Sequence, residues 1–176
     1  MTGSWGQARR QGARQKPLQE FETLYDQCFR GVYGYLAARL QDSQTAEDLT
    51  SETFLRAWRG WPPRKVTGNV PRAWVFQIAR NLVVDHYRAS ARRQMVPLDE
   101  ASAHNAWNIP GEDGHLTTID LHMALATLSP RDQDVLSLRL AGLPNREIGS
   151  VLKLSEAAAG MACLRALRRL GEKLEA

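Results

Sequence analysis

Residues 54–98 hold nine Lys or Arg side chains against one acid, interleaved with aromatic rings. A single nucleic-acid strand is bound where a positively charged path lies beside rings on which bases stack. The residues that could build such a path are Trp58, Trp61, Lys65, Arg72, Trp74, Phe76, Arg80, His86, Tyr87 and Arg88. Among them, we expect Trp58 and Trp74 to be core residues. In the helical projection, Phe76 and Tyr87 lie nearer the surface.

The charge along the rest of the chain changes sign from block to block, although the net charge is only +4. Residues 17–53 hold seven acids against two basic residues, and residues 99–120 hold five acids with no Lys or Arg. A polyanion would therefore bind at the positive blocks. The mean hydropathy is -0.41, and no apolar run is long enough to span a bilayer. We expect a cytoplasmic protein without membrane contact of its own.

Patterns that carry catalytic or metal chemistry are missing from the sequence. The four His residues lack metal-ligand spacing such as HExxH, and no Gly-rich phosphate loop occurs. Cys28 and Cys163 have no CxxC partner and are expected in the core. Asp85 and His86 are neighbours on a predicted helix and face different ways. The sequence therefore predicts no catalytic residue, no metal site and no cofactor.

Helical periodicity predicts the elements that position these side chains. Apolar residues at spacings of three and four predict helices over 18–40, 43–61 and 72–93. Pro62 and Pro63 end the second of these, and a basic loop follows.

The C-terminal part has the spacing of a helix-turn-helix. Ser129 as an N-cap and Pro130 at the first helical position predict a helix that ends at Gly142. A short helix over 145–152, a three-residue turn and a helix to about Leu174 follow. Because no hairpin signal lies between alternating apolar runs, the predicted fold class is all-α.

Composition divides the chain into two small helical domains joined by an acidic flexible linker. We expect a disordered basic arm at 1–17, a first domain at 18–95, the linker at 96–118 and a helix-turn-helix domain at 119–176.

Two runs in the first domain closely resemble domain 2 of bacterial RNA polymerase sigma factors of the extracytoplasmic-function (ECF) group. They are AEDLTSETFLRAWRGW at 46–61 and RAWVFQIARNLVVDHYRASARR at 72–93. In the second domain, the run at 124–155 resembles domain 4 of that family: ALATLSPRDQDVLSLRLAGLPNREIGSVLKLS. The resemblance implies a dissociable transcription-initiation subunit that is not itself an enzyme.

The resemblance also implies which residues contact polymerase. In the family, the second helix docks on the β′ coiled coil and domain 4 meets the β flap. The matching residues here are Asp48, Leu49, Ser51, Glu52, Leu55, Arg56 and Arg59. Ser51 stands where Gln is usual. An exposed helix face that mixes acids, Arg and apolar groups suits another helix pair, and the acidic linker would follow basic channels of the polymerase.

For the -10 promoter element, the resemblance implies that the basic loop and third helix open and read the DNA. A flipped base must be held in a pocket, which small residues would allow. The loop candidates are Lys65, Thr67, Gly68 and Asn69. The helix candidates are Arg72, Gln77, Arg80, Asn81, Asp85, His86, Arg88, Arg92 and Arg93.

The -35 candidates lie on the helix-turn-helix and depart from the family pattern. They are Lys153, Ser155, Ala158, Met161, Arg165, Arg168 and Arg169. The start of the recognition helix, residues 156–163, has no basic side chain, and Ala and Gly cannot donate paired hydrogen bonds to guanine. Lys153 replaces the usual turn Gly, and Pro144 replaces the usual Ser or Thr. We therefore expect weak -35 reading, or an apolar surface that serves a protein partner.

Promoter DNA, core polymerase and an anti-sigma protein are the partners that the resemblance implies. Two alternatives remain at this point: a helix-turn-helix regulator that binds duplex DNA without polymerase, and a protein-binding adaptor.

Overall fold

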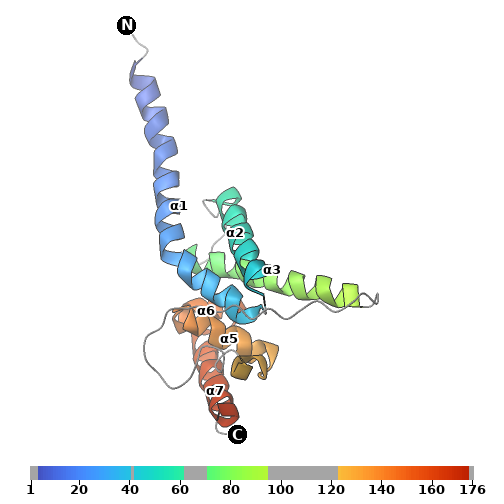
Figure 1. The fold of residues 1–176 in the computed structure, drawn as a ribbon. Helices are drawn as coiled ribbons and strands as arrows, with labels where there is room; N and C mark the ends of the chain where they lie inside the picture. The colour runs from blue at the N-terminus through green and yellow to red at the C-terminus, as the bar shows by residue number, and fades with distance from the viewer. Residues whose placement is uncertain (1–3, 41, 62–70, 95–122, 175–176) are drawn as a thin grey trace, which may run out of the picture.

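The structure is a computed structural model that describes residues 4–40, 42–61, 71–94 and 123–174. Every regular element in these ranges is a helix, which confirms the all-α prediction (Figure 1). The helices are α1 (Ser4–Arg39), α2 (Ser43–Arg59), α3 (Pro71–Gln94), α5 (Pro130–Leu140), α6 (Asn145–Leu152) and α7 (Glu156–Leu174), with a short helical segment at 123–126. None of the described helices is both long and apolar enough to cross a membrane.

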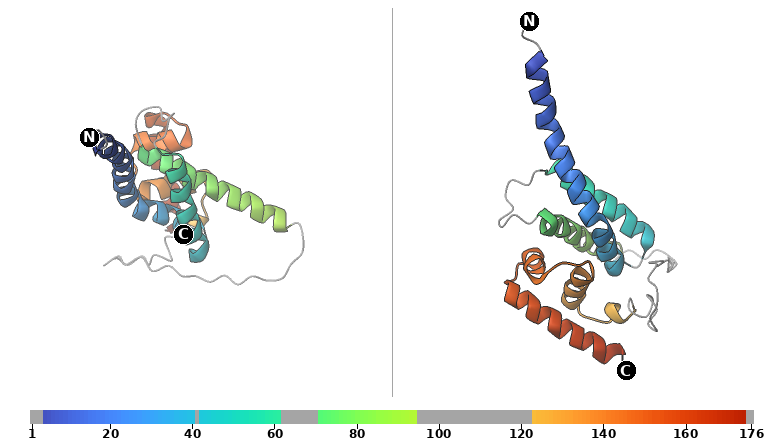
Figure 2. Two further views of the ribbon diagram at one scale, coloured as in Figure 1. Left: turned by 90° about the horizontal axis from the view of Figure 1, so that it is seen from above. Right: turned by 90° about the vertical axis from the view of Figure 1, so that its left-hand side faces the viewer.

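We call α1–α3 the N-terminal unit, and residues 123–174 the C-terminal unit. Helices α5 and α6 lie between the N-terminal unit and α7, while the first half of α1 projects away from the other helices (Figure 2). The linker predicted at 96–118 falls outside the described residues. The predicted three-residue turn of the helix-turn-helix is present at 153–155.

Helix starts follow the local sequence signals. The Asp42 carboxylate accepts hydrogen bonds from the Thr45 hydroxyl and from the backbone N–H groups of Thr45 and Gln44. The bond from the Thr45 hydroxyl, followed by the backbone bonds, holds the pKa of Asp42 below its ordinary value. At α5, the Ser129 hydroxyl accepts from the Asp132 N–H, and Pro130 occupies the first turn, as predicted. Pro144 precedes α6 without a side-chain cap.

Helix α1 begins earlier than the sequence pattern indicated. Its backbone is helical from Ser4 and runs through Pro17, whereas we predicted a disordered arm at 1–17. Residues 7–16 are mostly Gln, Arg, Ala and Lys, which have high helix propensity. Propensity therefore extends the helix in a segment without apolar periodicity.

One hydrophobic core runs through both units. Cys28, Val32 and Tyr35 of α1 belong to the same buried cluster as Val135 of α5 and Ile148 of α6. A second cluster, formed by Leu125, Leu136, Ala166 and others, lies inside the C-terminal unit. Cys28 and Cys163 are both buried, as predicted, and burial raises the pKa of the Cys28 thiol to about 11.

Two aromatic residues of the N-terminal unit differ from prediction. Phe76, expected near the surface, has an exposed fraction of 0%. It is buried because α3 packs on the C-terminal unit as well as on α1 and α2. Trp58, expected in the core, is 46% exposed because it lies at the rim of the unit. Only part of its ring is covered, by an edge contact with Phe21 whose ring centroid lies 5.0 Å away. Trp74 is half-buried and packs against the core, and Tyr87 is exposed.

Candidate nucleic-acid and protein-docking surfaces

Helix α2 presents a mixed polar and apolar face to solvent. The predicted polymerase-contacting residues Asp48, Ser51, Leu55, Arg56 and Arg59 are exposed on it. Glu52 pairs with Arg56 one turn later at 2.7 Å. Glu52 and Leu49 are half-buried, and Leu49 packs against the core. The structure thus exposes five of the seven predicted residues.

Exposed aromatic and apolar side chains extend this face in a way that the sequence analysis missed. Trp58 stands one turn beyond Leu55 on α2, and both are about half exposed. On α1, Tyr25 and Phe29 are also exposed, and their rings pack with Phe54. Helical spacing assigned Trp58 to the core, and only its exposure in the structure adds it to the α2 face.

The -10 candidates divide between two environments on α3. Asn81, Asp85, Arg88 and Arg92 are exposed, and Arg88 pairs with Asp85 at 3.9 Å. Four others are half-buried: Arg72, Gln77, Arg80 and His86. The loop residues Lys65, Thr67, Gly68 and Asn69 and the Arg93 side chain lie outside the described part of the chain. Half of the eight described candidates on α3 are therefore exposed and half are partly covered.

Arg72 and Arg80 contact the C-terminal unit. One terminal nitrogen of Arg72 donates to the Ala141 carbonyl at 2.9 Å, and its Nε lies 3.8 Å from the Glu147 carboxylate. The Arg80 Nε donates to Asp134 Oδ2 at 2.9 Å. Two side chains predicted to face promoter DNA thus hold the two units together in this structure.

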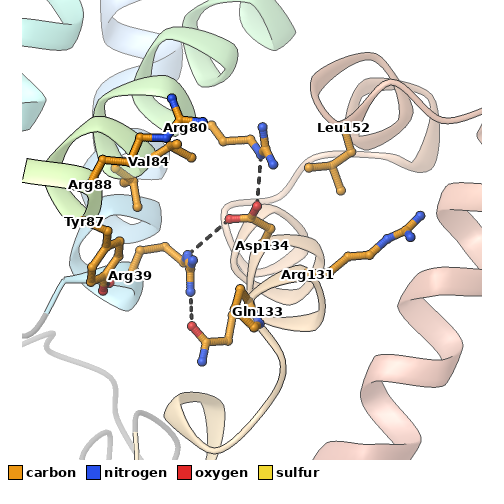
Figure 3. A pocket seen from close by; sticks show the side chains of 11 residues that line it. Arg39, Arg80, Val84, Tyr87, Arg88, Arg131, Gln133, Asp134 and Leu152 are labelled. Carbon is orange, nitrogen blue, oxygen red and sulfur yellow. Dashed lines mark hydrogen bonds and ion pairs between the residues drawn. The ribbon is translucent and has the colours of Figure 1, made fainter. Parts of the chain in front are cut away.

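Asp134 is the centre of this interface (Figure 3). Besides Arg80, its carboxylate pairs with the Arg39 Nε at 3.2 Å and accepts a hydrogen bond from the Tyr35 hydroxyl at 3.1 Å. Arg39 also donates to the Gln133 side chain. Burial, followed by the Asp134 charge, raises the pKa of Tyr35 far above its ordinary value, so its hydroxyl stays a donor.

A groove of about 730 Å³ opens beside Asp134 between the two units (Figure 3). Its charged lining is mostly basic and comprises Arg39, Arg80, Arg88, Arg131 and Asp134. Val83, Val84 and Leu152 supply apolar wall. Sequence reasoning did not single out Arg39 or Asp134. The available signal was an acid at 134 within an apolar-rich helix, where a charge needs a partner.

The helix-turn-helix exposes six of its seven predicted residues, and Ala158 is half-buried. Lys153 adopts a left-handed backbone conformation with φ of 56°, the conformation for which Gly is usual. The Ser155 hydroxyl accepts from the Ala158 N–H and so caps α7. Arg169 is paired with Asp132 at 2.6 Å within the C-terminal unit. Arg165 and Arg168 are exposed.

The outer side of α7 is apolar over much of its length. Met161, Leu164, Leu167 and Leu174 are exposed. Their spacing places them on a face next to the buried one, which includes Ala162, Ala166 and Leu170. An exposed apolar stripe of this kind is typical of a surface that binds another protein.

Comparison with known families accounts for both units. The family model described as Sigma-70 region 2 matches residues 24–93, and Sigma-70, region 4 matches residues 118–170. ECF RNA polymerase sigma factor SigL of Mycobacterium tuberculosis is 31% identical over 130 residues, which cover 73% of each chain. The chain belongs to the ECF RNA polymerase sigma factors. This confirms the predicted resemblance, and the family is not an enzyme family.

Two further similarities cover most of this chain. ECF sigma factor BldN of Streptomyces coelicolor is 39% identical over 158 residues, and the match spans 88% of this chain but 60% of BldN. The solved structure of the sigma factor RpoE with the anti-sigma factor NepR, from Bartonella quintana, has a TM-score of 0.70. It covers 89% of this chain and 98% of RpoE at 22% identity, which shows a shared fold.

In the described residues of this sigma factor, no group of three or more His, Cys, Asp or Glu side chains is arranged to hold a metal ion. The residues that the structure gathers are instead arginines, acids and exposed apolar groups. Such groups bind polyanions and other proteins.

Proposed function

We propose that this sigma factor binds core RNA polymerase and directs it to promoters, where the N-terminal unit opens and reads the -10 element. The observation that carries the proposal is the exposed mixed face of α2 beside a basic α3 and a helix-turn-helix in one ECF chain. Its place of action is then the cytoplasm, where polymerase and chromosome meet.

In this proposal, the α2 face binds a helical coiled coil of the polymerase. Leu55 and Trp58 supply apolar contact, and the Glu52–Arg56 pair and Asp48 supply polar contact around it. An apolar centre within a polar rim is the usual anatomy of a dissociable protein interface.

The test is run-off transcription by core polymerase reconstituted with the purified chain. Leu55→Ala with Arg59→Ala should lower core binding by at least about tenfold, because truncating even one hot-spot residue near the centre of an interface costs about 2 kcal/mol or more. Glu47→Ala is the matched control, since Glu47 is exposed on α2 but outside the predicted contact set. Failure of the unaltered chain to bind core would overturn the proposal, and duplex-DNA binding without core binding would favour a helix-turn-helix regulator.

We also propose that the -35 element is contacted weakly, through phosphates and shape rather than paired hydrogen bonds to bases. The first two turns of α7 carry no Lys or Arg, while Arg165 and Arg168 lie exposed further along. Arg165→Ala with Arg168→Ala should remove -35 footprinting and leave core binding intact. Unchanged footprinting would contradict this and would favour the apolar stripe of α7 as a protein-binding surface.

An anti-sigma protein is the remaining proposed partner. The solved complex of RpoE with NepR supports it, because that sigma factor shares this fold. A purified protein that binds this chain and lowers its run-off transcription would establish such a partner. An inhibitor acting only on core polymerase would not.

A further inference from the structure

Two guanidinium groups from different helices of the N-terminal unit converge on one carboxylate of the C-terminal unit. Arg39 ends α1 and Arg80 lies mid-way along α3, and each pairs with a different oxygen of Asp134. The Arg39 side chain is 7% exposed, and the Asp134 side chain is 10% exposed. The Tyr35 hydroxyl donates to the same carboxylate at 3.1 Å. Three donors thus surround one anion.

All three donors belong to the N-terminal unit, whereas the carboxylate that they bind belongs to the C-terminal unit. Both of the ion pairs that Arg39 and Arg80 make within the described residues go to Asp134. If the C-terminal unit moved away, the N-terminal unit would keep two adjacent arginines and a hydroxyl without their acid. Arginine guanidinium groups bind carboxylates and phosphates with the same paired geometry.

We propose that Arg39 and Arg80 form a phosphate-binding site for the backbone of promoter DNA, which Asp134 occupies in this structure. Carboxylate and phosphodiester each carry one negative charge shared by two oxygens, so one can replace the other between the same donors. On the N-terminal unit itself, positive charge continues from this pair to Arg88, which lines the same groove and lies 3.9 Å from Asp85. The proposal rests on the proposed function, because α3 is the helix assigned there to the -10 element.

Promoter DNA and the C-terminal unit therefore compete for the same site on the N-terminal unit. A phosphate and Asp134 cannot lie between Arg39 and Arg80 together, so binding at this site requires the C-terminal unit to separate. Arg72 would be released in the same step from Ala141 and Glu147. In the free chain, the C-terminal unit then covers the DNA site. The apparent affinity for DNA equals the affinity of the open form multiplied by the fraction of molecules that are open.

The test measures binding of the full-length chain to a fluorescein-labelled oligo(dT) strand over a series of salt concentrations. Asp134→Asn removes the competing charge with little change in volume and should tighten binding by about tenfold if about one chain in ten is open beforehand. Asp132→Asn is the matched control. Asp132 is an equally buried acid on α5, but it pairs with Arg169 inside the C-terminal unit, so its substitution should give no gain.

The arginines are tested in the Asp134→Asn background. Adding Arg39→Gln or Arg80→Gln should reverse the gain and make the slope of log K against log salt shallower by about 0.7, the value for one lost contact with a single strand. Arg80 is the second variant because its side chain is 34% exposed and tolerates substitution better than buried Arg39.

Two outcomes would overturn the inference. Equal gains in Asp134→Asn and Asp132→Asn would show that loosening α5 is sufficient. A gain that neither Arg39→Gln nor Arg80→Gln reverses would place the DNA elsewhere. Run-off transcription by the unaltered chain separates this inference from the proposed function. An active chain without the Asp134→Asn gain refutes only the phosphate site, and an inactive chain with the gain refutes only the sigma activity.

Discussion

The two units use charged residues in opposite ways. The N-terminal unit keeps many of its charges exposed, on the α2 face and along the second half of α3. The C-terminal unit buries two acids on α5, Asp132 and Asp134, and each holds arginine. Asp132 binds Arg169 of its own unit, whereas Asp134 binds arginines of the other unit. These two acids lie only two residues apart on α5 but differ in role. Asp132 stabilises its own unit, and Asp134 stabilises the contact between the units.

Phe76→Ala should have the largest effect and tests whether the units share one core. Truncating a fully buried Phe costs about 3–5 kcal/mol. All Trp residues precede residue 119, so fluorescence follows the N-terminal part while far-UV circular dichroism follows both units. In urea, we expect the two signals to change together in both proteins and at lower urea in the variant. Separate transitions in the unaltered chain would show two independent units.

Gly149→Ala tests how tightly the helix-turn-helix is built. An added Cβ would lie 2.7 Å from the Leu154 carbonyl oxygen, so we expect a loss of about 1–3 kcal/mol in free energy of unfolding. Gly171→Ala on α7 is the control, because no atom lies within 4 Å of its added Cβ. That variant should gain about 0.5–1 kcal/mol. Equal effects would contradict the close approach of α6 to the turn.

Ser129→Ala removes the cap of α5 and should lower the free energy of unfolding by about 1 kcal/mol. The Ser129 hydroxyl also donates to Asp132, which in turn binds Arg169. The loss should therefore lower the urea midpoint of the single transition shared by both units, followed by far-UV circular dichroism. Ser129→Asp should restore much of the stability, since Asp also caps well. No rescue would assign the loss to the Asp132 contact instead.

Gly31→Ala and Gly34→Ala compare packing between the units with packing at an open position on α1. At Gly31, an added Cβ would lie 3.1 Å from the Ala141 carbonyl of the other unit, whereas at Gly34 nothing lies within 4 Å. Gly34→Ala should gain about 0.5–1 kcal/mol by thermal unfolding. Gly31→Ala should gain less or lose stability. The same gain at both positions would argue against close contact of α1 with α5.

The caps of α2 and α5 should differ in their response to acid, with the smallest effect of the set. Asp42 has a lowered pKa in the folded chain, so its stabilisation is present above its unfolded pKa and is lost as pH falls through the folded value. The Ser129 hydroxyl does not titrate. Asp42→Asn should therefore make the free energy of unfolding fall less steeply as the pH drops below about 4, near the reference pKa of Asp. Ser129→Ala should leave this pH dependence unchanged.

Local signals were sufficient for much of this molecule. Ser129 and Pro130 predicted the start of α5, and the three-residue turn at 153–155 followed from spacing. The α2 contact face came from the family resemblance and stays a prediction; in the structure Leu49 packs inward, and Trp58, assigned to the core by helical spacing, is exposed. Single-helix periodicity identifies one buried stripe. It does not show where a helix reaches the rim of its unit.

By itself, the sequence determined the helices apart from the first part of α1, the order of the two units and the family, because these depend on spacing, caps and motifs along the chain. Only the tertiary structure decided that Phe76 is buried, that Arg72 and Arg80 face the C-terminal unit, and that Arg39 and Asp134 matter at all. The physical reason is that Arg39, Arg72, Arg80 and Asp134 make their contacts between the units with residues 54 or more positions away in the sequence. No local sequence pattern encodes such contacts.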